Sequence, residues 1–371
     1  MNEQLKSHVE EVAGHFQYEG ELLSVQPYGN GHINDTYLLS YQIGKMGEMR
    51  VILQKMNRNV FPNPVELMEN VVGVTEFLKR KIEARGGDIY RETLTVIPAV
   101  DGKSYYEDKE GGFWRSLVYI TDSSCYESAQ SKEVFYESAY AFGNFQSLLA
   151  DYPADTLHET IANFHNTKER FAAFRKAVEA DAMGRAKDVQ EEIRFVLDRE
   201  ADACFFTDLL EKGELPLRVT HNDTKINNIL VDSRTNKGLC VIDLDTVMPG
   251  LAMNDFGDSI RSGASTGAED EKDLSKISCD MELFDIYAKG FIEGCNGKLT
   301  KREIELLPMG AKIMTYECGM RFLTDYLQGD TYFKIHRPEH NLDRCRTQFK
   351  LVADMESKWD IMTDIVKKYA Q

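Results

Sequence analysis

The sequence predicts an α+β protein of two lobes: a small, mostly antiparallel β lobe with one main helix, followed by a larger, mostly helical lobe. Short apolar runs separated by turn residues fill the first third of the chain, and long helical periods follow residue 121. The length of 371 residues exceeds the roughly 100–200 residues of a typical single domain. We therefore expect a first lobe over residues 1–120 and a second over residues 121–371.

The first lobe is expected to contain short strands and one amphipathic helix. The expected strands are residues 22–28, 37–41, 50–54, 94–100 and 114–120. In the stretch 64–84, Pro64 stands where a helix begins, and apolar residues recur at helical spacing. This pattern predicts a helix over 64–84, inserted between the third and fourth strands.

The second lobe reads as helices for most of its length. Helical periods are clearest at 134–149, 168–210 and 343–369. The helices between 168 and 212 are highly charged, which is typical of a solvated face, although a partner-binding surface gives the same pattern. We favour the solvated face.

Composition excludes several classes of function. The chain has 61 acidic against 44 basic residues and a formal net charge of −17, so neither nucleic acid nor an anionic membrane is an expected partner. Seven cysteines without a Cys-x-x-Cys pair predict neither a disulfide framework nor a zinc site. The amino terminus lacks the features of a signal peptide, and no apolar run has the length of a bilayer span. We expect a cytoplasmic protein, acting as a monomer or small homo-oligomer.

A β-hairpin is predicted in the segment VTHNDTKINNILVDSRTNKGLCVIDLD, residues 219–245. Apolar strands at 229–231 and 239–242 flank the turn-forming residues 233–238. If the turn is centred between residues 235 and 236, Asn228 faces Asp243, with their Cβ atoms roughly 5 Å apart. Oxygen ligands at this spacing suit Mg2+, and we predict that Asn228 and Asp243 bind it.

Two further aspartates flank this pair. Asp223 precedes Asn228 by five residues, in the order His-x-Asp-x-x-x-x-Asn that kinase-like enzymes use to orient a hydroxyl and hold a metal. On an extended strand Asp245 would share a face with Asp243, while Leu244 would point to the core; this predicts a supporting or substrate-binding role for Asp245. Taken singly, the aspartates are also ordinary turn or cap residues. Their combined spacing favours phosphoryl transfer, with Asp223 as the base.

The neighbouring His221 has a simpler interpretation. We expect it to hold the loop by hydrogen bonds rather than to take part in chemistry.

Phosphate-binding residues are expected in the first lobe. Gly29, Asn30 and Gly31 lie between two strands, where glycines let backbone N–H groups approach phosphate, although Gly-Asn-Gly is also ordinary hairpin chemistry. Neither a Walker phosphate loop nor a dinucleotide fingerprint occurs.

Lys55 ends the third strand in VILQK, where a kinase-like fold places a lysine on the α- and β-phosphates, although it could simply end an exposed strand. Glu69, on the helix that follows, is the predicted partner of Lys55, with Glu66 and Glu76 as alternatives.

These motifs resemble a known group of enzymes. THNDTKINNIL together with VIDLDT is similar to the aminoglycoside-phosphotransferase and choline-kinase superfamily of small-molecule kinases, which have a bilobal protein-kinase-like fold. Longer segments resemble the bacterial N-acetylhexosamine 1-kinases over most of the chain. These segments are PYGNGHINDTYLL, VILQKMN, FPNPVELMENV, VIDLDTVMPG and ECGMRFLTDYLQGDTYFK.

The resemblance implies ATP and Mg2+ as cofactors and phosphorylation of the anomeric hydroxyl of N-acetylglucosamine or N-acetylgalactosamine. It also implies that Asp223 holds the attacking hydroxyl, and that the backbone around residues 114–120, including Tyr119 and Ile120, meets adenine at the hinge. The residues it implies for the sugar pocket are His32, Arg321 and Tyr332. One departure is Asn34, which stands where protein kinases have their third loop glycine.

Some alternatives stay open at the level of sequence. Arg321 lies in a mostly apolar helical stretch, where a guanidinium needs either a buried carboxylate or a bound polar ligand. The acceptor could be another small alcohol, such as an aminoglycoside, choline, homoserine or methylthioribose. The chain could also be a catalytically silent nucleotide-binding regulator, but such proteins usually lose a key residue, and Lys55, Asp223, Asn228 and Asp243 are all present.

Overall fold

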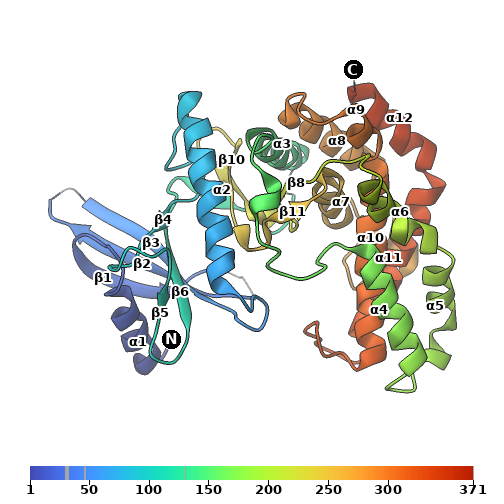
Figure 1. Cartoon of the computed structure of the whole chain (residues 1–371), viewed down its shortest axis with the longest axis horizontal. Coiled ribbons are helices and arrows are strands. Elements are labelled where there is room, and N and C mark those ends of the chain that lie inside the picture. The colour runs from blue at the N-terminus through green and yellow to red at the C-terminus, as the bar shows by residue number, and fades with distance from the viewer. Residues whose placement is uncertain (30–32, 46, 130, 371) are drawn as a thin grey trace.

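The computed structural model describes residues 1–29, 33–45, 47–129 and 131–370, and these residues form two lobes (Figure 1). In the described part of the first lobe, six strands form one sheet in the order β1-β2-β3-β6-β4, with β5 also paired to β6, and every pair is antiparallel. The strands are β1 (Glu21–Pro27), β2 (Asp35–Ile43), β3 (Gly47–Met56), β4 (Val96–Ile97), β5 (Tyr106–Glu107) and β6 (Phe113–Val118).

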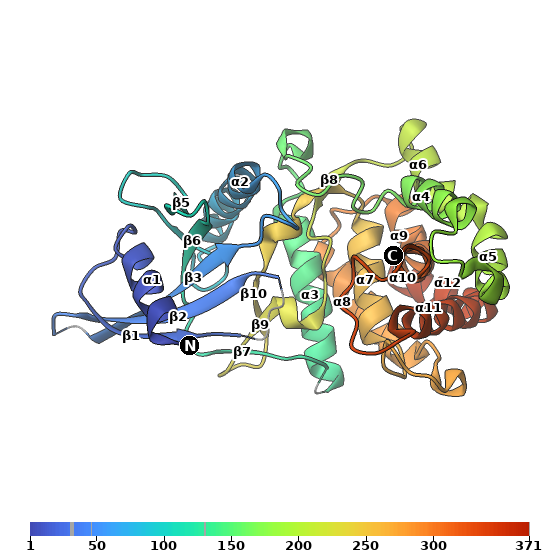
Figure 2. The same ribbon diagram turned by 90° about the horizontal axis from the view of Figure 1, so that it is seen from below.

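Two helices cover opposite faces of this sheet, α1 (Glu3–Ala13) and α2 (Pro64–Ala84) (Figures 1 and 2). Because side chains alternate along a strand, β3 contributes to both cores. Val51 and Leu53 pack in the cluster that contains the buried residues of α1, whereas Met56 and Ile52 pack in the cluster of α2. A side chain of β3 therefore packs toward either α1 or α2, depending on the face of the sheet from which it projects.

The expected elements of the first lobe are present with some differences, and the short strand β5 was not among those expected. The helix predicted over 64–84 has those bounds. The strand expected over 94–100 shrinks to Val96–Ile97, because Pro98 has no N–H for a ladder and Ala99 turns back to bond the carbonyl of Lys103. The helix α1 had no counterpart among the expected elements.

The second lobe is mainly helical, with two small sheets facing the first lobe (Figure 2). One sheet has the order β10-β9-β7 and the other pairs β11 with β8, all antiparallel. The strands are β7 (Ser123–Cys125), β8 (Arg218–Thr220), β9 (Ile229–Asp232), β10 (Gly238–Val241) and β11 (Met248–Gly250).

The helical period predicted over 168–210 is divided among three helices by turns. The α-helices of this lobe are α3 (Lys132–Leu148), α4 (Thr167–Ala180), α5 (Gln190–Leu197), α6 (Glu200–Glu211), α7 (Ala252–Gly263), α8 (Met281–Cys295), α9 (Lys301–Glu305), α10 (Leu307–Gln328), α11 (His340–Ser357) and α12 (Trp359–Tyr369). Short 3-10 turns are η1 (Ala154–Thr156), η2 (Ala186–Asp188), η3 (Ile226–Asn228), η4 (Leu244–Thr246) and η5 (Leu274–Lys276).

A close helix crossing holds α7 beneath the two small sheets. A Cβ on Gly257 of α7 would lie 2.2 Å from the carbonyl oxygen of Gly310 in α10, so only glycine permits this approach. The rest of α7 is buried almost throughout. This rigid helix carries Asp255 and Asp258, which organise the candidate site.

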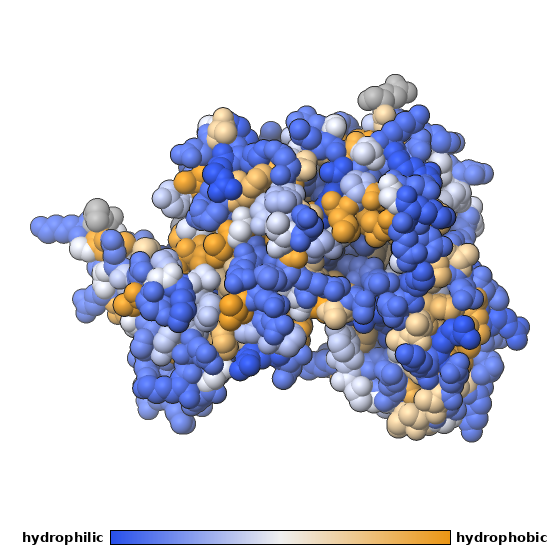
Figure 3. Space-filling view, in the orientation of Figure 1, coloured by the Kyte–Doolittle hydropathy of each residue, from blue (hydrophilic) through white to orange (hydrophobic). Residues whose placement is uncertain are grey.

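The molecular surface is largely polar. In the orientation of Figure 1, hydrophilic residues cover most of the face, and hydrophobic residues gather only in separate small groups (Figure 3). Within the described ranges, no helix combines the length and the apolar character that crossing a bilayer requires.

Candidate active site

The loop between β8 and η3 carries the His-x-Asp segment, and α7 fixes its backbone. The Asp255 carboxylate accepts hydrogen bonds from the backbone N–H groups of His221, at 2.9 Å, and Asn222, at 2.8 Å. Asn222 adopts a left-handed conformation with φ of 65°, and its side chain donates to the carbonyl of Thr246 at 2.9 Å. The loop is therefore held on both sides before any ligand binds.

His221 has the structural role expected from sequence. Its side chain is fully buried, and Nε2 lies 2.8 Å from the carbonyl oxygen of Ile242. A carbonyl only accepts, so Nε2 carries the proton and Nδ1 accepts from the backbone N–H of Asp223 at 3.3 Å. His221 thereby ties the start of the loop to the end of β10.

Asp223 lies at the centre of this loop. It contacts Asn228, which was predicted for the site, and Lys225, which was not. The Asn228 side chain donates from Nδ2 to the Asp223 carboxylate at 3.1 Å and to the Asp223 carbonyl at 2.7 Å. On the other side, Nζ of Lys225 lies 2.7 Å from Oδ1 of Asp223. Asp223 is partly exposed, so its carboxylate remains accessible to a ligand.

The predicted hairpin exists, but its register differs by one residue. Cys240 pairs with Leu230 and Val241 with Ile229, and a bulge separates these pairs from Gly238. The bulge follows a turn that Asp232 shapes by accepting hydrogen bonds from successive backbone amides. The predicted pairing of Asn228 with Asp243 is therefore wrong.

The shifted register still leaves these two residues adjacent. The carbonyl of Asn228 accepts from the N–H of Ile242 at 2.9 Å, and Asp243 is the next residue in the chain. The two residues predicted to bind the metal are therefore neighbours across the hairpin, through a different backbone arrangement, and their metal role stays a prediction.

The expectation that Asp243 and Asp245 share one face of an extended strand is also wrong. Asp243 is left-handed, with φ of 58°, and residues Leu244–Thr246 form a 3-10 turn. Leu244 is buried in the core, as predicted. Asp245 is consequently buried, whereas Asp243 is exposed.

Asp243 has the electrostatic environment of a cation ligand. Enclosure by the surrounding protein, and then the charges of Asp245 and Asp223, raise its pKa to about 6. The residue is nevertheless solvent-exposed on one side, so an ion can reach it. A divalent cation would relieve the repulsion among these carboxylates.

The donor set fits Mg2+ only in part. A carboxylate from Asp243 and an amide oxygen from Asn228 are the hard oxygen ligands that Mg2+ prefers. Among the residues that the structure describes, no three His, Cys, Asp or Glu side chains are grouped to hold a metal. The remaining ligands would have to be phosphate oxygens and water, as in kinase-like sites.

Asp245 binds residues of the first lobe, and sequence reasoning missed these partners. Its carboxylate forms a buried ion pair with Arg115 of β6 and accepts from Nδ2 of Asn34 at 2.6 Å. Arg115 could have been noticed from the sequence, because it is a charged residue inside the apolar strand FWRSLV. Arg321 was singled out for the same reason, as a charged residue in an apolar helical stretch. Asp255 carries a similar signal in LAMNDFGDSIRS, as a carboxylate in a segment that becomes fully buried.

Lys55 and Glu69 do not meet, and their predicted pairing is wrong. Glu69 instead accepts from Nε2 of His158, with Oε2 2.7 Å from that nitrogen. Lys55 lies on the α1 face of the sheet with Val51 and Leu53, its Nζ 5.5 Å from the centre of the Trp114 ring.

The surroundings of Lys55 confirm this placement on the α1 face. Burial raises the pKa of Asp108, but hydrogen bonds from Trp114 and from backbone amides, with the charge of Lys55, lower it overall. The same Asp108 carboxylate lies 3.3 Å from Nε2 of His8 in α1. The structure therefore places Lys55 beside Trp114 and Asp108, and its role as the phosphate contact stays a prediction.

The predicted glycine loop is only partly described. Gly29 has φ of 75°, a conformation that favours glycine. Asn30, Gly31 and His32 lie outside the described residues.

At the hinge, the N–H of Tyr119 donates to the carbonyl of Arg50 at 3.1 Å, and the Arg50 guanidinium stacks 4.5 Å from the Tyr119 ring centre. Ile120 is buried in the core that includes Leu244 of the second lobe. The hinge is thus packed against both lobes.

Arg321 and Tyr332 lie together in the second lobe. Nη2 of Arg321 is 3.5 Å from the Tyr332 hydroxyl, and its guanidinium lies 5.5–5.7 Å from the ring centres of Tyr332, Phe333 and Phe164. Within the described part of the chain, no carboxylate lies within ion-pair distance of Arg321. The sequence left open either a buried carboxylate or a bound polar ligand as the partner of Arg321. The described residues provide no such carboxylate.

A buried histidine connects this region to the catalytic loop. His165 lies with Nδ1 2.8 Å from Oε1 of Glu317 in α10 and with Nε2 3.1 Å from the carbonyl of Asn222. Both neighbours are acceptors, so both ring nitrogens carry protons. Burial lowers the pKa of His165, but the charge and hydrogen bond of Glu317 outweigh it and raise the pKa overall. Arg321 is one helical turn beyond Glu317 on α10.

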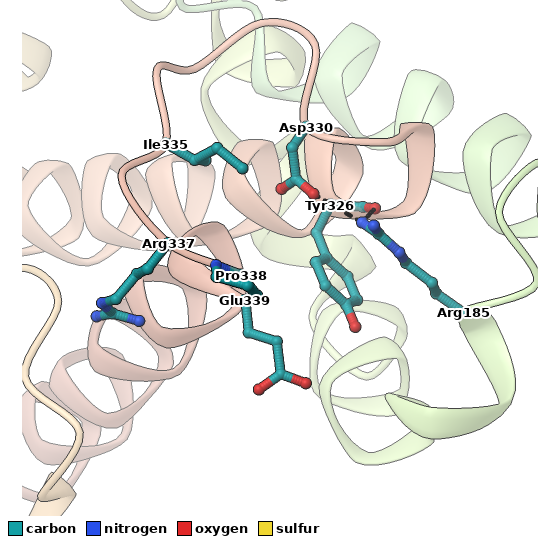
Figure 4. Close-up of a pocket in the computed structure, with 7 residues that line it drawn as sticks. All are labelled: Arg185, Tyr326, Asp330, Ile335, Arg337, Pro338 and Glu339. Atoms are coloured by element: carbon teal, nitrogen blue, oxygen red, sulfur yellow. Dashed lines mark hydrogen bonds and ion pairs between the residues drawn. The ribbon is translucent and has the colours of Figure 1, made fainter.

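A separate cavity of about 580 Å³ lies at the end of α10 (Figure 4). Arg185 lines this cavity. It pairs with Asp330 at 2.7 Å, and its guanidinium lies 4.6 Å from the centre of the Tyr326 ring. The described residues that line it include none of those predicted for the site.

Comparison with known proteins shows which family profile the sequence matches and which solved structures share the fold. Residues 24–276 match the sequence profile of the phosphotransferase enzyme family, APH. An aminoglycoside phosphotransferase from Alicyclobacillus acidocaldarius is similar in structure, with a TM-score of 0.60 and 11% identity over 97% of this chain and 96% of its own. A choline kinase from Cryptosporidium parvum has a TM-score of 0.53 and 14% identity, over 94% and 93%.

A third solved structure was determined with ligands bound. The amicoumacin kinase hAmiN, in complex with AMP-PNP, Ca2+ and Ami, has a TM-score of 0.56 and 12% identity, over 96% of both chains. At these identities the likeness concerns the fold, and it confirms the predicted α+β, bilobal, kinase-like class.

Proposed function

The chain belongs to the phosphotransferase enzyme family, and we propose that it is an ATP-dependent sugar 1-kinase. In this proposal the terminal phosphoryl group of ATP moves to the anomeric hydroxyl of N-acetylglucosamine or N-acetylgalactosamine. Support for phosphoryl transfer comes from the hydrogen bond between Asn228 and Asp223 and from the charge repulsion between the Asp223 and Asp243 carboxylates.

Each residue has a defined part in this reaction. Asp223 orients the acceptor hydroxyl and accepts its proton, while the Asn228 amide and Lys225 hold the carboxylate in position. The acceptor oxygen bonds to the γ-phosphorus, the bond from that phosphorus to the β,γ-bridging oxygen breaks, and ADP leaves. Asn228 and Asp243 would hold Mg2+, which neutralises charge on the phosphates. Most of the acceleration comes from positioning and from preorganised charge.

The acceptor side favours an uncharged sugar over a cationic alcohol. Arg321 has no carboxylate within ion-pair distance among the described residues, and Arg170 lies close enough for the two charges to repel; burial, and then Arg321, lower the pKa of Arg170. Arg170 donates to the carbonyl of Phe164 at 3.2 Å, and Arg321 lies against the ring of the same residue.

Two guanidinium groups in this place would repel choline or an aminoglycoside. The same groups, with Tyr332 and Phe164, offer donors and ring faces for sugar hydroxyls and an acetamido carbonyl. The resemblance of the 317–334 segment to N-acetylhexosamine 1-kinases supports this choice.

The proposal is tested by supplying candidate acceptors with ATP and Mg2+. The panel contains N-acetylglucosamine, N-acetylgalactosamine, glucose, choline, homoserine, methylthioribose and an aminoglycoside, and ADP release gives the rate. We expect the two acetamido sugars to react far faster than the others. Phosphorus NMR identifies the product, because an anomeric phosphate differs from a primary one. Turnover of choline or an aminoglycoside without turnover of the sugars would overturn the sugar assignment.

A further inference from the structure

Lys55 lies on the α1 face of the sheet, so in this arrangement a different cation must meet the nucleotide phosphates. The chain carries a net charge of −17, and Asp223, Asp243 and Asp245 are gathered where the phosphates would lie. A polyanion enters such a site only if fixed positive charge balances the field. Lys225 is already paired with Asp223, at 2.7 Å, which leaves the first lobe to supply a second cation.

The strand β3 shows why its lysine is out of reach. Kinase-like folds place the β3 lysine on the face directed at the nucleotide. Here Gln54 occupies that face, and the next residue, Lys55, points to the α1 side. Gln54 pairs with Arg115 across the ladder to β6, so the two side chains lie together on the face directed at the second lobe.

A network of hydrogen bonds fixes the Arg115 guanidinium. Nε donates to Oε1 of Gln54 at 2.9 Å, and Nε2 of Gln54 donates to the hydroxyl of Thr36 on β2 at 3.0 Å. Only 3% of Arg115 is exposed, so the guanidinium cannot turn to bulk water. Its position is therefore determined by three neighbouring strands.

Asp245 connects Arg115 to a second residue of the first lobe. One Asp245 oxygen pairs with Arg115, and the other accepts from Nδ2 of Asn34 at 2.6 Å. Asn34 also accepts from the backbone N–H of Asn57 at 2.9 Å, just after the end of β3. Asp243, the predicted metal ligand, is two residues before Asp245 in the chain. The partner of Arg115 is therefore close in sequence to the predicted metal site.

We propose that Arg115 is the first-lobe cation that contacts the phosphates of the nucleotide, and that Gln54 and Asp245 orient it. The guanidinium has five N–H groups, and among the described residues its bonds to Gln54 and Asp245 use two of them. The remaining donors suit phosphate oxygens in a fork geometry. The pair of Arg115 with Asp245 thereby replaces the lysine–glutamate pair of other kinase-like sites. This inference rests on the proposed function in taking a nucleoside triphosphate as the donor.

Nucleotide binding without an acceptor tests the inference. Calorimetry with Mg2+ measures the affinity of ADP and of adenosine, which lacks phosphates, for the wild type, Arg115→Met and Lys55→Met. We expect Arg115→Met to weaken ADP by about tenfold or more, since a charge-assisted contact is lost, and to change adenosine by less than about twofold. Lys55→Met is the matched control and should leave both affinities unchanged. Equal loss of ADP and adenosine, or loss of ADP in Lys55→Met alone, would overturn the inference.

Removing Arg115 alone leaves the buried Asp245 carboxylate without its partner, which could unfold the protein. The double variant Arg115→Met with Asp245→Asn removes both charges and should show the same selective loss of ADP affinity. Because no acceptor is present, the result does not depend on which alcohol the enzyme phosphorylates. Wild-type protein that binds neither ligand would instead overturn the proposed kinase activity together with this inference.

Discussion

Nδ2 of Asn228 lies 3.1 Å from the carboxylate of Asp223, so the amide that is proposed to bind the metal also touches the proposed base. The same Nδ2 donates to the Asp223 carbonyl at 2.7 Å, which leaves Oδ1 of the amide for a cation. One side chain thereby couples metal binding to the position of the base.

Asn228→Ala should reduce both functions at once. We expect kcat to fall by about tenfold to a hundredfold, because a hydrogen bond to a charged group is lost. We also expect the Mg2+ concentration for half-maximal rate to rise, since one ligand is missing. Initial rates over a Mg2+ titration measure both quantities. A variant with lower kcat and an unchanged Mg2+ requirement would leave Asn228 as a positioning residue only.

Arg321→Ala should act on the acceptor and leave the nucleotide unaffected. We expect the KM for the acetamido sugar to rise by about tenfold or more, because a donor to the sugar is removed, while the KM for ATP stays within about twofold. Arg175→Ala is the matched control, because Arg175 is exposed on α4. Equal changes in both KM values would argue that Arg321 supports the fold rather than the substrate.

The buried pair of His165 with Glu317 should make stability depend on pH in a defined window. The pKa of His165 is raised in the folded protein, so its contribution is complete below the ordinary histidine value of about 6.5 and is lost as pH rises through the raised value. Burial raises the pKa of Glu317, but the charge of His165 and hydrogen bonds lower it overall, so its contribution is present above about 4.3 and is lost in acid. The pair therefore stabilises the fold most between these two values.

His165→Gln measures this contribution. We expect a loss of about 2 to 3 kcal/mol in the free energy of unfolding at pH 5.5, because a buried carboxylate loses its partner, and a smaller loss at pH 9. Urea titrations at the two pH values give the difference. His158→Gln is the control, since His158 pairs with Glu69 at the surface and such pairs contribute little. An equal loss at both pH values would contradict the ionised pair.

The local features of the site could be predicted from the sequence, and the long-range ones could not. The hairpin and its three oxygen-bearing residues follow from turn residues and apolar runs that lie within a span of 27 residues, 219–245. Its register was missed by one, because a bulge is shaped by side-chain bonds of Asp232 that periodicity does not reveal.

The orientation of β3 was missed for a different reason. Helices cover both faces of the sheet, so apolar residues no longer alternate with polar ones, and the pattern does not tell on which face Lys55 lies. The roles of Arg115 and Asp255 depend on partners 130 and 33 or more residues away along the chain. Only the folded arrangement brings these partners together.

Asp223→Asn tests the account most directly. The variant keeps the shape of the side chain and removes the ability to accept a proton, so it should bind ADP with Mg2+ within about twofold of the wild type and lose about 10²- to 10⁴-fold in kcat for the acetamido sugar. Calorimetry and single-turnover rates measure the two quantities on the same preparation. A folded Asp223→Asn variant that turns over at a near-normal rate would contradict the assignment of this site as the centre of phosphoryl transfer.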